Sequence, residues 1–275
     1  MRILLTGAGG QLGRDLQETL NGHDLRAFDH AGLDVADREA VLRTVQQVHP
    51  AWIINAAAFN NVDGAETAVE TAFAVNGAGP GYLAEAASGV GAGIVHISTD
   101  YVFDGTRGAP YTEEDVPNPL SVYARSKYDG ERRVIESGAS ACVLRTAWLY
   151  GRHGRNFVKA IQAAAETGGP LRVVSDQVGS PTATADLAQA IAQLIQTPAR
   201  GVFHAVNGGA CSRFEFAQAI VRGAVEVLPI TTAQAPRGAR RPANSSLASV
   251  RWNLAGLTPL RSWRLALDSF LADSG

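Results

Sequence analysis

The chain begins with a short apolar run, a cluster of glycines and a helical pattern, and this order restricts the possible folds more than any other feature. Residues 2–6 predict a buried strand, and residues 14–20 have a helical pattern. Between them, Gly7, Gly10 and Gly13 recur at every third position. Glycines permit a tight turn, and the first turn of a helix has N–H groups free to bind a pyrophosphate. Although a glycine cluster can simply be a turn, this order favours a dinucleotide site.

Strand and helix patterns alternate along the first half of the chain. Short apolar strand patterns cover residues 25–28, 51–54, 93–97 and 141–145. Helical patterns follow Asp37, cover 64–75 and 78–90, and run from Ser121 or Asn118 to about Glu136. This alternation predicts an α/β fold built on a Rossmann-like, doubly wound parallel sheet. We expect this dinucleotide-binding domain to span 1–147 and to be rejoined by about 184–206, where a helix (184–196) and a sixth strand (201–206) follow.

The pattern changes after residue 147 to polar and aromatic loops between shorter elements. We expect helices near 156–167, over 212–225 and over 263–271, and a strand-like segment at 171–174. Ser212 with Glu215 three residues later predicts a capping box. The loop 236–245 is rich in arginine, which suits phosphate recognition, although such loops are more often simply solvated. Residues 148–183 and 207–275 therefore predict a smaller C-terminal substrate-binding region.

Composition excludes several classes of protein. The net charge of -2 argues against a nucleic-acid partner, since the arginines are balanced by carboxylates. Two cysteines, Cys142 and Cys211, are too few for a disulfide framework and lack metal-ligand spacing. No apolar run approaches the length of a membrane span. We expect a soluble, cytoplasmic protein with no membrane partner.

Two features near the second and third strands point to the cofactor. Asp29 ends the second strand and could accept hydrogen bonds from an adenosine ribose, which would favour NADH; it could equally be a turn residue. Arg26 and His30 could offset a 2'-phosphate, so NADPH stays open. The small side chains of Asn55 to Ala58 leave room for a flat ligand, although a closely packed helix start has the same composition.

The pair Tyr123 and Lys127 is the strongest indication of chemistry. Residues four apart share one face of a helix, and a cation beside a phenol favours its ionised form and eases proton transfer. The alternative is an ordinary surface pair. The chain has only two lysines, Lys127 and Lys159, against 22 arginines, which suggests a position where arginine would not serve. Thr99 follows the fourth strand, so we expect it at the same sheet edge.

These motifs together resemble the extended short-chain dehydrogenase/reductase superfamily. Further stretches resemble the dTDP-4-dehydrorhamnose reductase family within it, and the resemblance covers nearly the whole chain. The stretches are Ser98-Thr99-Asp100-Tyr101-Val102-Phe103, Arg145-Thr146-Ala147-Trp148-Leu149-Tyr150, Asp176-Gln177-Val178-Gly179-Ser180-Pro181-Thr182 and Arg241-Pro242-Ala243-Asn244-Ser245.

The resemblance implies roles for individual residues. Tyr123 would protonate the C4 oxygen of the sugar as a hydride arrives, Lys127 would bind the nicotinamide ribose, and Thr99 would bind the same carbonyl oxygen. Positions that touch the sugar nucleotide would be Thr99, Asp100 and Trp148, with Arg241 and Asn244 near its nucleotide end. Cofactor-contacting positions would be Gly7, Gly10, Gln11, Leu12, Gly13, Asp29, Asp34, Val35, Ala56, Ala57, Ala58, Phe59 and Asn60, together with Tyr123 and Lys127.

The sequence departs from the family at a metal site and in the cofactor pocket. Some members are dimers bridged by magnesium through three acidic residues. Asp15 matches one of these, but Ala185 stands at the second with Asp186 adjacent, and the third has no counterpart that we could place. We therefore expect a homodimer as a possibility and regard bound Mg²⁺ as doubtful. Phe59 and Asn60 also differ from the smaller, more polar pair expected there.

The resemblance implies reduction of dTDP-4-dehydro-6-deoxy-L-mannose to dTDP-L-rhamnose with NADPH or NADH. A reductase for another dTDP-4-ketosugar would need the same three catalytic residues. A different class, a non-catalytic regulatory subunit such as that of methionine adenosyltransferase, shares the fold. The presence of Thr99, Tyr123 and Lys127 argues against that reading.

Overall fold

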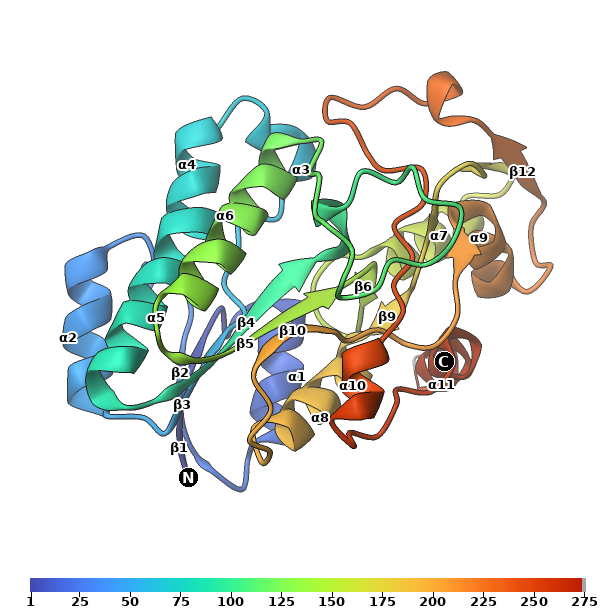
Figure 1. The fold of residues 1–275 in the computed structure, drawn as a ribbon. Helices are drawn as coiled ribbons and strands as arrows, with labels where there is room; N and C mark the ends of the chain where they lie inside the picture. The colour runs from blue at the N-terminus through green and yellow to red at the C-terminus, as the bar shows by residue number, and fades with distance from the viewer. Residues whose placement is uncertain (274–275) are drawn as a thin grey trace.

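The computed structural model describes residues 1–273 and is built around a parallel sheet (Figure 1). In the part of the chain that is described, this sheet has six strands in the order β10-β5-β4-β3-β1-β2. Their bounds are β1 (Arg2–Thr6), β2 (Asp24–Phe28), β3 (Trp52–Asn55), β4 (Gly93–Thr99), β5 (Ser140–Thr146) and β10 (Gly201–His204). The order runs outward in both directions from β1 and β3, so the prediction of a doubly wound α/β sheet is confirmed.

Helices cover both faces of the sheet, because alternate strand residues point to opposite sides. Ile3 and Leu5 pack under α1 (Gln11–Thr19) and α8 (Thr184–Leu194), whereas Leu4 packs on the other side. That other side is covered by α2 (Arg38–Val48), α5 (Gly79–Val90) and α6 (Val122–Glu136). Figure 1 shows α1 and α8 on one side of the strands, opposite α2, α5 and α6. The inner strands β1, β3, β4 and β5 are therefore buried on both faces, as their apolar runs predict, whereas the edge strand β2 is largely exposed.

The helix predicted over 64–75 is wrong in its bounds. The structure has two short helices, α3 (Val62–Ala65) and α4 (Val69–Phe73), and α4 continues through a π-helical turn, η1 (Ala74–Ala78), directly into α5. Pro80 has no N–H to donate to the carbonyl of Asn76, which interrupts the regular ladder at this point. A Cβ at Gly130 of α6 would lie 2.1 Å from that carbonyl oxygen, so α6 packs very closely against the turn.

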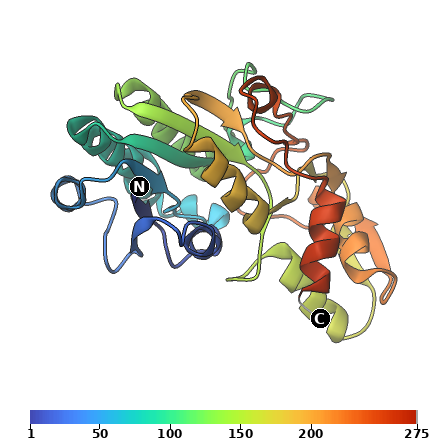
Figure 2. The ribbon, with the colours of Figure 1, turned by 90° about the horizontal axis from the view of Figure 1, so that it is seen from below.

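The C-terminal region forms its own apolar cluster beside the sheet (Figure 2). Its main helices are α7 (Phe157–Glu166), α9 (Arg213–Val221) and α11 (Trp263–Ala272), with α10 (Val250–Leu254) near β10. The capping box at Ser212 and Glu215 is confirmed. Short paired strands connect the rest: β6 (Leu149–Tyr150) with β9 (Thr182–Ala183), β8 (Val178–Gly179) with β11 (Cys211–Ser212), and β7 (Leu171–Val174) with β12 (Val227–Ile230).

No helix within residues 1–273 is long and apolar enough to cross a membrane.

Candidate active site

A cavity of about 450 Å³ opens at the carboxyl edge of the sheet, where α/β folds place their ligands. The glycine turn forms one wall, the ends of β3 and β4 form the floor, and α6 forms another wall. Residues that follow β5 complete the cavity on the side of the C-terminal region. Predicted site residues that line it are Gly10, Gln11, Leu12, Gly13, Ala56, Ala58, Asn60, Thr99, Asp100, Tyr123, Lys127 and Trp148.

The glycine turn accepts only glycine at two of its three positions. Gly7 has φ +72°, and a Cβ there would lie 2.5 Å from the backbone of Ala56. A Cβ at Gly13 would lie 2.2 Å from the carbonyl oxygen of Gly7. Gly10 precedes α1 and has no side chain to cap the helix, so the first N–H groups of α1 are available to a ligand. This cradle suits the diphosphate of a dinucleotide, which fits the predicted cofactor.

The predicted cofactor residues Asp29, Asp34 and Val35 lie away from this cavity. Asp29 accepts a hydrogen bond from Gly32 N at 2.9 Å, as a turn residue would, and lines a separate groove of about 340 Å³ with Arg14. Asp34 accepts from Ala36 N at 2.9 Å, and Val35 is buried. The groove at Asp29 adjoins the glycine turn, whereas Asp34 and Val35 belong to the connection toward α2.

The segment after β3 divides between the cavity and the protein interior. Ala56, Ala58 and Asn60 line the cavity, whereas Ala57 donates its N–H to Asn55 Oδ1 at 3.1 Å. The backbone of Phe59 forms two hydrogen bonds with the side chain of Asn76, at 2.8 and 3.1 Å. The structure therefore places Ala57 and Phe59 beside the cavity and not in its wall.

Helix α6 presents Tyr123 and Lys127 to the cavity on one face, as their spacing predicts. Ser121 caps this helix, since its Oγ accepts from Ala124 N at 3.2 Å. Lys127 is buried, and its Nζ donates to the carbonyl oxygen of Ile97 at 2.6 Å. Burial lowers the pKa of Lys127 to about 8, against the opposing effect of Glu131.

The expected lowering of the phenol pKa by a neighbouring cation is not what the structure shows. Burial raises the pKa of Tyr123 above its ordinary value, and the Thr99 hydroxyl opposes that shift only in part. The Lys127 ammonium is directed at the Ile97 carbonyl and does not contribute to the shift. Tyr123 is therefore a protonated phenol at neutral pH, which suits a proton donor.

Thr99 and Asp100 form a small polar group beside Tyr123. Thr99 Oγ1 donates to Asp100 Oδ1 at 3.1 Å and accepts from Tyr101 N at 3.2 Å. Ser245 donates to the other carboxylate oxygen of Asp100 at 2.5 Å. Burial raises the pKa of Asp100 to about 6 in spite of these hydrogen bonds. A carboxyl that is buried at the cavity wall can select a partner with hydroxyl donors.

A buried ion pair beneath Lys127 was not predicted. Arg145 of β5 donates from two nitrogens to Glu131 of α6, the shortest contact being 2.8 Å, and the side chains are 4% and 3% exposed. Glu131 lies four residues after Lys127, so the helical spacing that paired Tyr123 with Lys127 could have shown it. His96 lies nearby, with Nδ1 3.1 Å from Asn55 Nδ2. The ion pair between Arg145 and Glu131 fixes α6 to β5.

Trp148 reaches the cavity from a strained backbone. Its φ is +46°, a left-handed conformation that non-glycine residues rarely adopt. The Arg213 guanidinium lies 3.5 Å from the centre of the indole ring, and Gly179 lies so close that a Cβ there would be 2.3 Å from the ring. Arg213 was not predicted, because only the folded chain brings it to Trp148.

Arg241 and Asn244 do not line the cavity. Arg241 forms a two-pronged ion pair with Asp63, at 2.9 and 3.0 Å, which joins the basic loop to α3. Asn244 donates to the carbonyl oxygen of Arg107 at 2.9 Å. Both residues therefore fasten loops at the border of the site.

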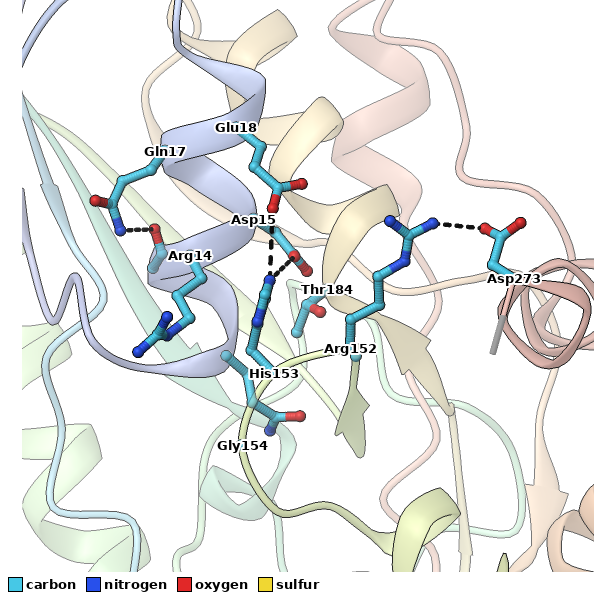
Figure 3. Close-up of polar contacts among 12 residues, drawn as sticks. Arg14, Asp15, Gln17, Glu18, Arg152, His153, Gly154, Thr184 and Asp273 are labelled. Atoms are coloured by element: carbon cyan, nitrogen blue, oxygen red, sulfur yellow. Dashed lines mark hydrogen bonds and ion pairs between the residues drawn. The ribbon is translucent and has the colours of Figure 1, made fainter. Parts of the chain in front are cut away.

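The acidic residues considered for metal binding lie beside basic side chains of this chain. Figure 3 shows His153 directed at Asp15 and Glu18 on α1, with Nε2 distances of 3.8 and 3.5 Å. Asp186 pairs with Arg261 at 2.8 Å. Within residues 1–273 no group of three His, Cys, Asp or Glu side chains could hold a metal ion.

Comparison with known proteins gives consistent relatives. A family model described as the RmlD substrate binding domain matches residues 1–275. The dTDP-4-dehydrorhamnose reductase of Mycobacterium tuberculosis (strain ATCC 25618 / H37Rv) is 46% identical over 283 residues, which cover 98% of this chain and 92% of that protein. The dTDP-4-keto-6-deoxy-D-glucose reductase of Streptomyces niveus is 40% identical over 273 residues, covering 97% and 95%.

A solved structure agrees with the sequence relatives. The dTDP-4-dehydrorhamnose reductase of Bacillus anthracis str. Ames, determined in complex with NADP, matches this chain with a TM-score of 0.96. The two are 41% identical, and the match covers 99% of each chain.

Proposed function

This chain belongs to the dTDP-4-dehydrorhamnose reductase family, and from that premise we propose that it reduces the C4 ketone of dTDP-4-dehydro-6-deoxy-L-mannose to give dTDP-L-rhamnose. The observation that supports this most is the convergence of Thr99, Tyr123 and Lys127 on the cavity that also contains the glycine turn. The hydride donor and the proton donor act on the same carbonyl group in such a reaction, so they must share one site.

The cofactor is NADPH or NADH, which supplies the hydride. Its diphosphate would be held by the first N–H groups of α1 beside Gly10 and Gln11, and its flat ring would lie against the small side chains of Ala56 and Ala58. The groove that contains Asp29 would hold the adenosine end, since it adjoins the glycine turn. These assignments follow from the free helix N-terminus and the absence of bulky side chains at the end of β3.

Tyr123 donates a proton to the C4 oxygen in this proposal. Burial keeps its phenol protonated at neutral pH, so the proton is present when the oxygen becomes negatively charged. Thr99 Oγ1 would turn its proton from Asp100 Oδ1 to the same oxygen and stabilise that charge. Lys127 lies one helical turn beyond Tyr123, where its ammonium would bind the nicotinamide ribose. One Nζ proton is used by Ile97, and two remain for ribose hydroxyls.

The sugar lies toward the C-terminal region. Asp100 would accept hydrogen bonds from sugar hydroxyls, and Trp148 would pack against the sugar ring. Arg241 and Asn244 would act indirectly, because their contacts with Asp63 and Arg107 hold the loops that border the cavity.

A second candidate is reduction of another dTDP-4-ketosugar. The relative from Streptomyces niveus, named for dTDP-4-keto-6-deoxy-D-glucose, is 40% identical over 97% of this chain. The catalytic residues act on the carbonyl alone and do not separate these substrates.

A turnover screen of the purified protein separates the two candidates. Each dTDP-4-ketohexose is supplied with NADPH or NADH, and loss of reduced nicotinamide absorbance is followed. We expect the highest kcat/KM with dTDP-4-dehydro-6-deoxy-L-mannose. A higher value with a different ketosugar would reject the first candidate, and no turnover with any of them would reject both.

A further inference from the structure

The loop of residues 151–156, between β6 and α7, contributes Arg155 to the wall of the active-site cavity. None of the positions assigned above to the cofactor lies in this loop. Arg155 is exposed and, within residues 1–273, has no hydrogen bond or ion pair with another side chain or carbonyl group. An arginine with all its donors free at the wall of a ligand cavity is available to an anionic ligand.

Both neighbours of Arg155 contact the first residue of α1. Asn156 Nδ2 donates to Gln11 Oε1 at 2.9 Å. Gly154 has φ +67°, and a Cβ there would lie 3.1 Å from Gln11 Cγ. The backbone of Arg155 is therefore held beside Gln11, at the start of α1.

Further contacts fix the loop in this position. His153 reaches from the loop to Asp15 and Glu18 on α1 (Figure 3). Asn156 also caps α7 by accepting from Lys159 N, and Lys159 Nζ donates to the carbonyl oxygen of Arg152 at 2.5 Å. A loop that is ordered before the ligand binds loses little conformational entropy on binding.

The charges at this place suit a diphosphate. The start of α1 carries the partial positive charge of a helix N-terminus and is not capped by a side chain. Among the described cavity-lining residues, the basic ones are Arg155 and Lys127. Lys127 donates a hydrogen bond to the Ile97 carbonyl oxygen, at the end of the cavity proposed for the nicotinamide ring.

We propose that Arg155 binds the diphosphate of the nicotinamide cofactor, opposite the N–H groups of α1. The C-terminal region thereby supplies a positively charged side chain at the diphosphate, whereas the glycine turn contains none. The identity of the ligand rests on the proposed function; the position of the cation does not.

Arg155→Ala and Arg155→Lys test this assignment, with Arg152→Ala as the matched control. Arg152 lies in the same loop and is exposed, but Figure 3 shows it directed at Asp273, which it contacts at 2.8 Å. The dissociation constants of NADPH, NADH and dTDP are measured by fluorescence or calorimetry, without turnover.

We expect Arg155→Ala to raise the dissociation constants of NADPH and NADH alike, by about tenfold to a hundredfold, because both cofactors contain the diphosphate. Arg155→Lys should keep part of the affinity, since a lysine retains the charge but not the two-pronged geometry. The affinity for dTDP and the affinities of Arg152→Ala should stay within about twofold of the wild type. The salt dependence of cofactor binding should also become shallower in Arg155→Ala.

Three results would overturn the assignment. Unchanged affinity of Arg155→Ala for both cofactors would remove the contact. A loss confined to NADPH would place Arg155 at the 2'-phosphate, and a loss confined to dTDP would place it at the diphosphate of the sugar nucleotide. A wild-type protein that binds both cofactors but reduces no dTDP-4-ketosugar would reject the proposed function and leave this assignment intact.

Discussion

The sheet and the C-terminal region form their halves of the cavity in different ways. On the sheet side, the glycine turn, Thr99 and the α6 pair occupy positions that follow from the regular alternation of strands and helices. On the C-terminal side, Trp148 depends on Arg213 and Gly179, which are distant in sequence. In the proposed function, repetitive local structure carries the chemistry, and single long-range contacts carry substrate recognition. Substitutions on the sheet side should therefore affect stability or catalysis broadly, whereas those on the other side should affect one ligand.

The largest expected effect concerns the sheet side. Glu131→Gln leaves the Arg145 guanidinium buried without its counter-charge, and it should lower the free energy of unfolding by about 3 to 5 kcal/mol. Chemical denaturation measures this change. Glu136→Gln, an exposed position on the same helix, is the control. A variant as stable as the control would show that α6 is not held to the sheet by this pair.

The next effect is a pH dependence at the border between the two sides. Burial raises the pKa of Asp100 from 3.8 to about 6, so the folded state holds this proton more tightly than the unfolded chain does. Below about pH 4 the protonated Asp100 carboxyl stabilises the folded state by up to about 3 kcal/mol, and this contribution is lost as the pH rises toward 6. The difference in unfolding free energy between the wild type and Asp100→Asn should therefore change across this range. A constant difference would contradict the raised pKa.

On the C-terminal side, Arg213→Ala should lower kcat/KM for the sugar substrate by about tenfold. Loss of the stacked guanidinium frees Trp148 from its strained backbone conformation, and a buried cation–π contact contributes on the order of 1 to 2 kcal/mol. The dissociation constant of the cofactor should not change. Arg264→Ala, which removes a similar stack on Trp263 outside the cavity, is the control. Equal losses in both variants would mean that Arg213 serves general stability only.

The smallest effect is at the far end of the cofactor. If Asp29 binds the adenosine ribose, Asp29→Ala should reduce kcat/KM for NADH a few-fold relative to NADPH, as loss of one hydrogen bond implies. Steady-state kinetics with both cofactors give this ratio. An unchanged ratio would mean that Asp29 acts only as a turn residue, through the hydrogen bond that it accepts from Gly32 N.

Sequence reasoning was most successful where structure is local. The strands were predictable because apolar runs between turn residues specify buried strands. The glycine turn was predictable because only glycine fits such a turn, and a Cβ at Gly7 or Gly13 would indeed have no space. The spacing of Tyr123 and Lys127 correctly predicted that they share one helix face. The predicted lowering of the Tyr123 pKa was wrong, because burial raises it. The contact between Lys127 and Ile97, and the burial that raises the phenol pKa, exist only after α6 packs on β4.

Long-range contacts explain what was not predicted. β12 contains Pro229 and an exposed Leu228, so it does not have the pattern of a buried strand and forms only beside β7. Arg213 and Arg155 are single arginines among many, and nothing in their neighbours indicates the cavity. The break in the helix predicted over 64–75 likewise depends on the packing of α6 against η1.

In the proposed reaction Tyr123 donates the proton that accompanies hydride transfer, and the kcat of Tyr123→Phe with the best ketosugar tests this role most directly. Removal of the phenol oxygen removes the proton donor and leaves the glycine turn intact. We predict a fall in kcat by about two to four orders of magnitude, with the dissociation constant of NADPH within about threefold of the wild type. A Tyr123→Phe protein that turns over at the wild-type rate would contradict the role of Tyr123 as proton donor.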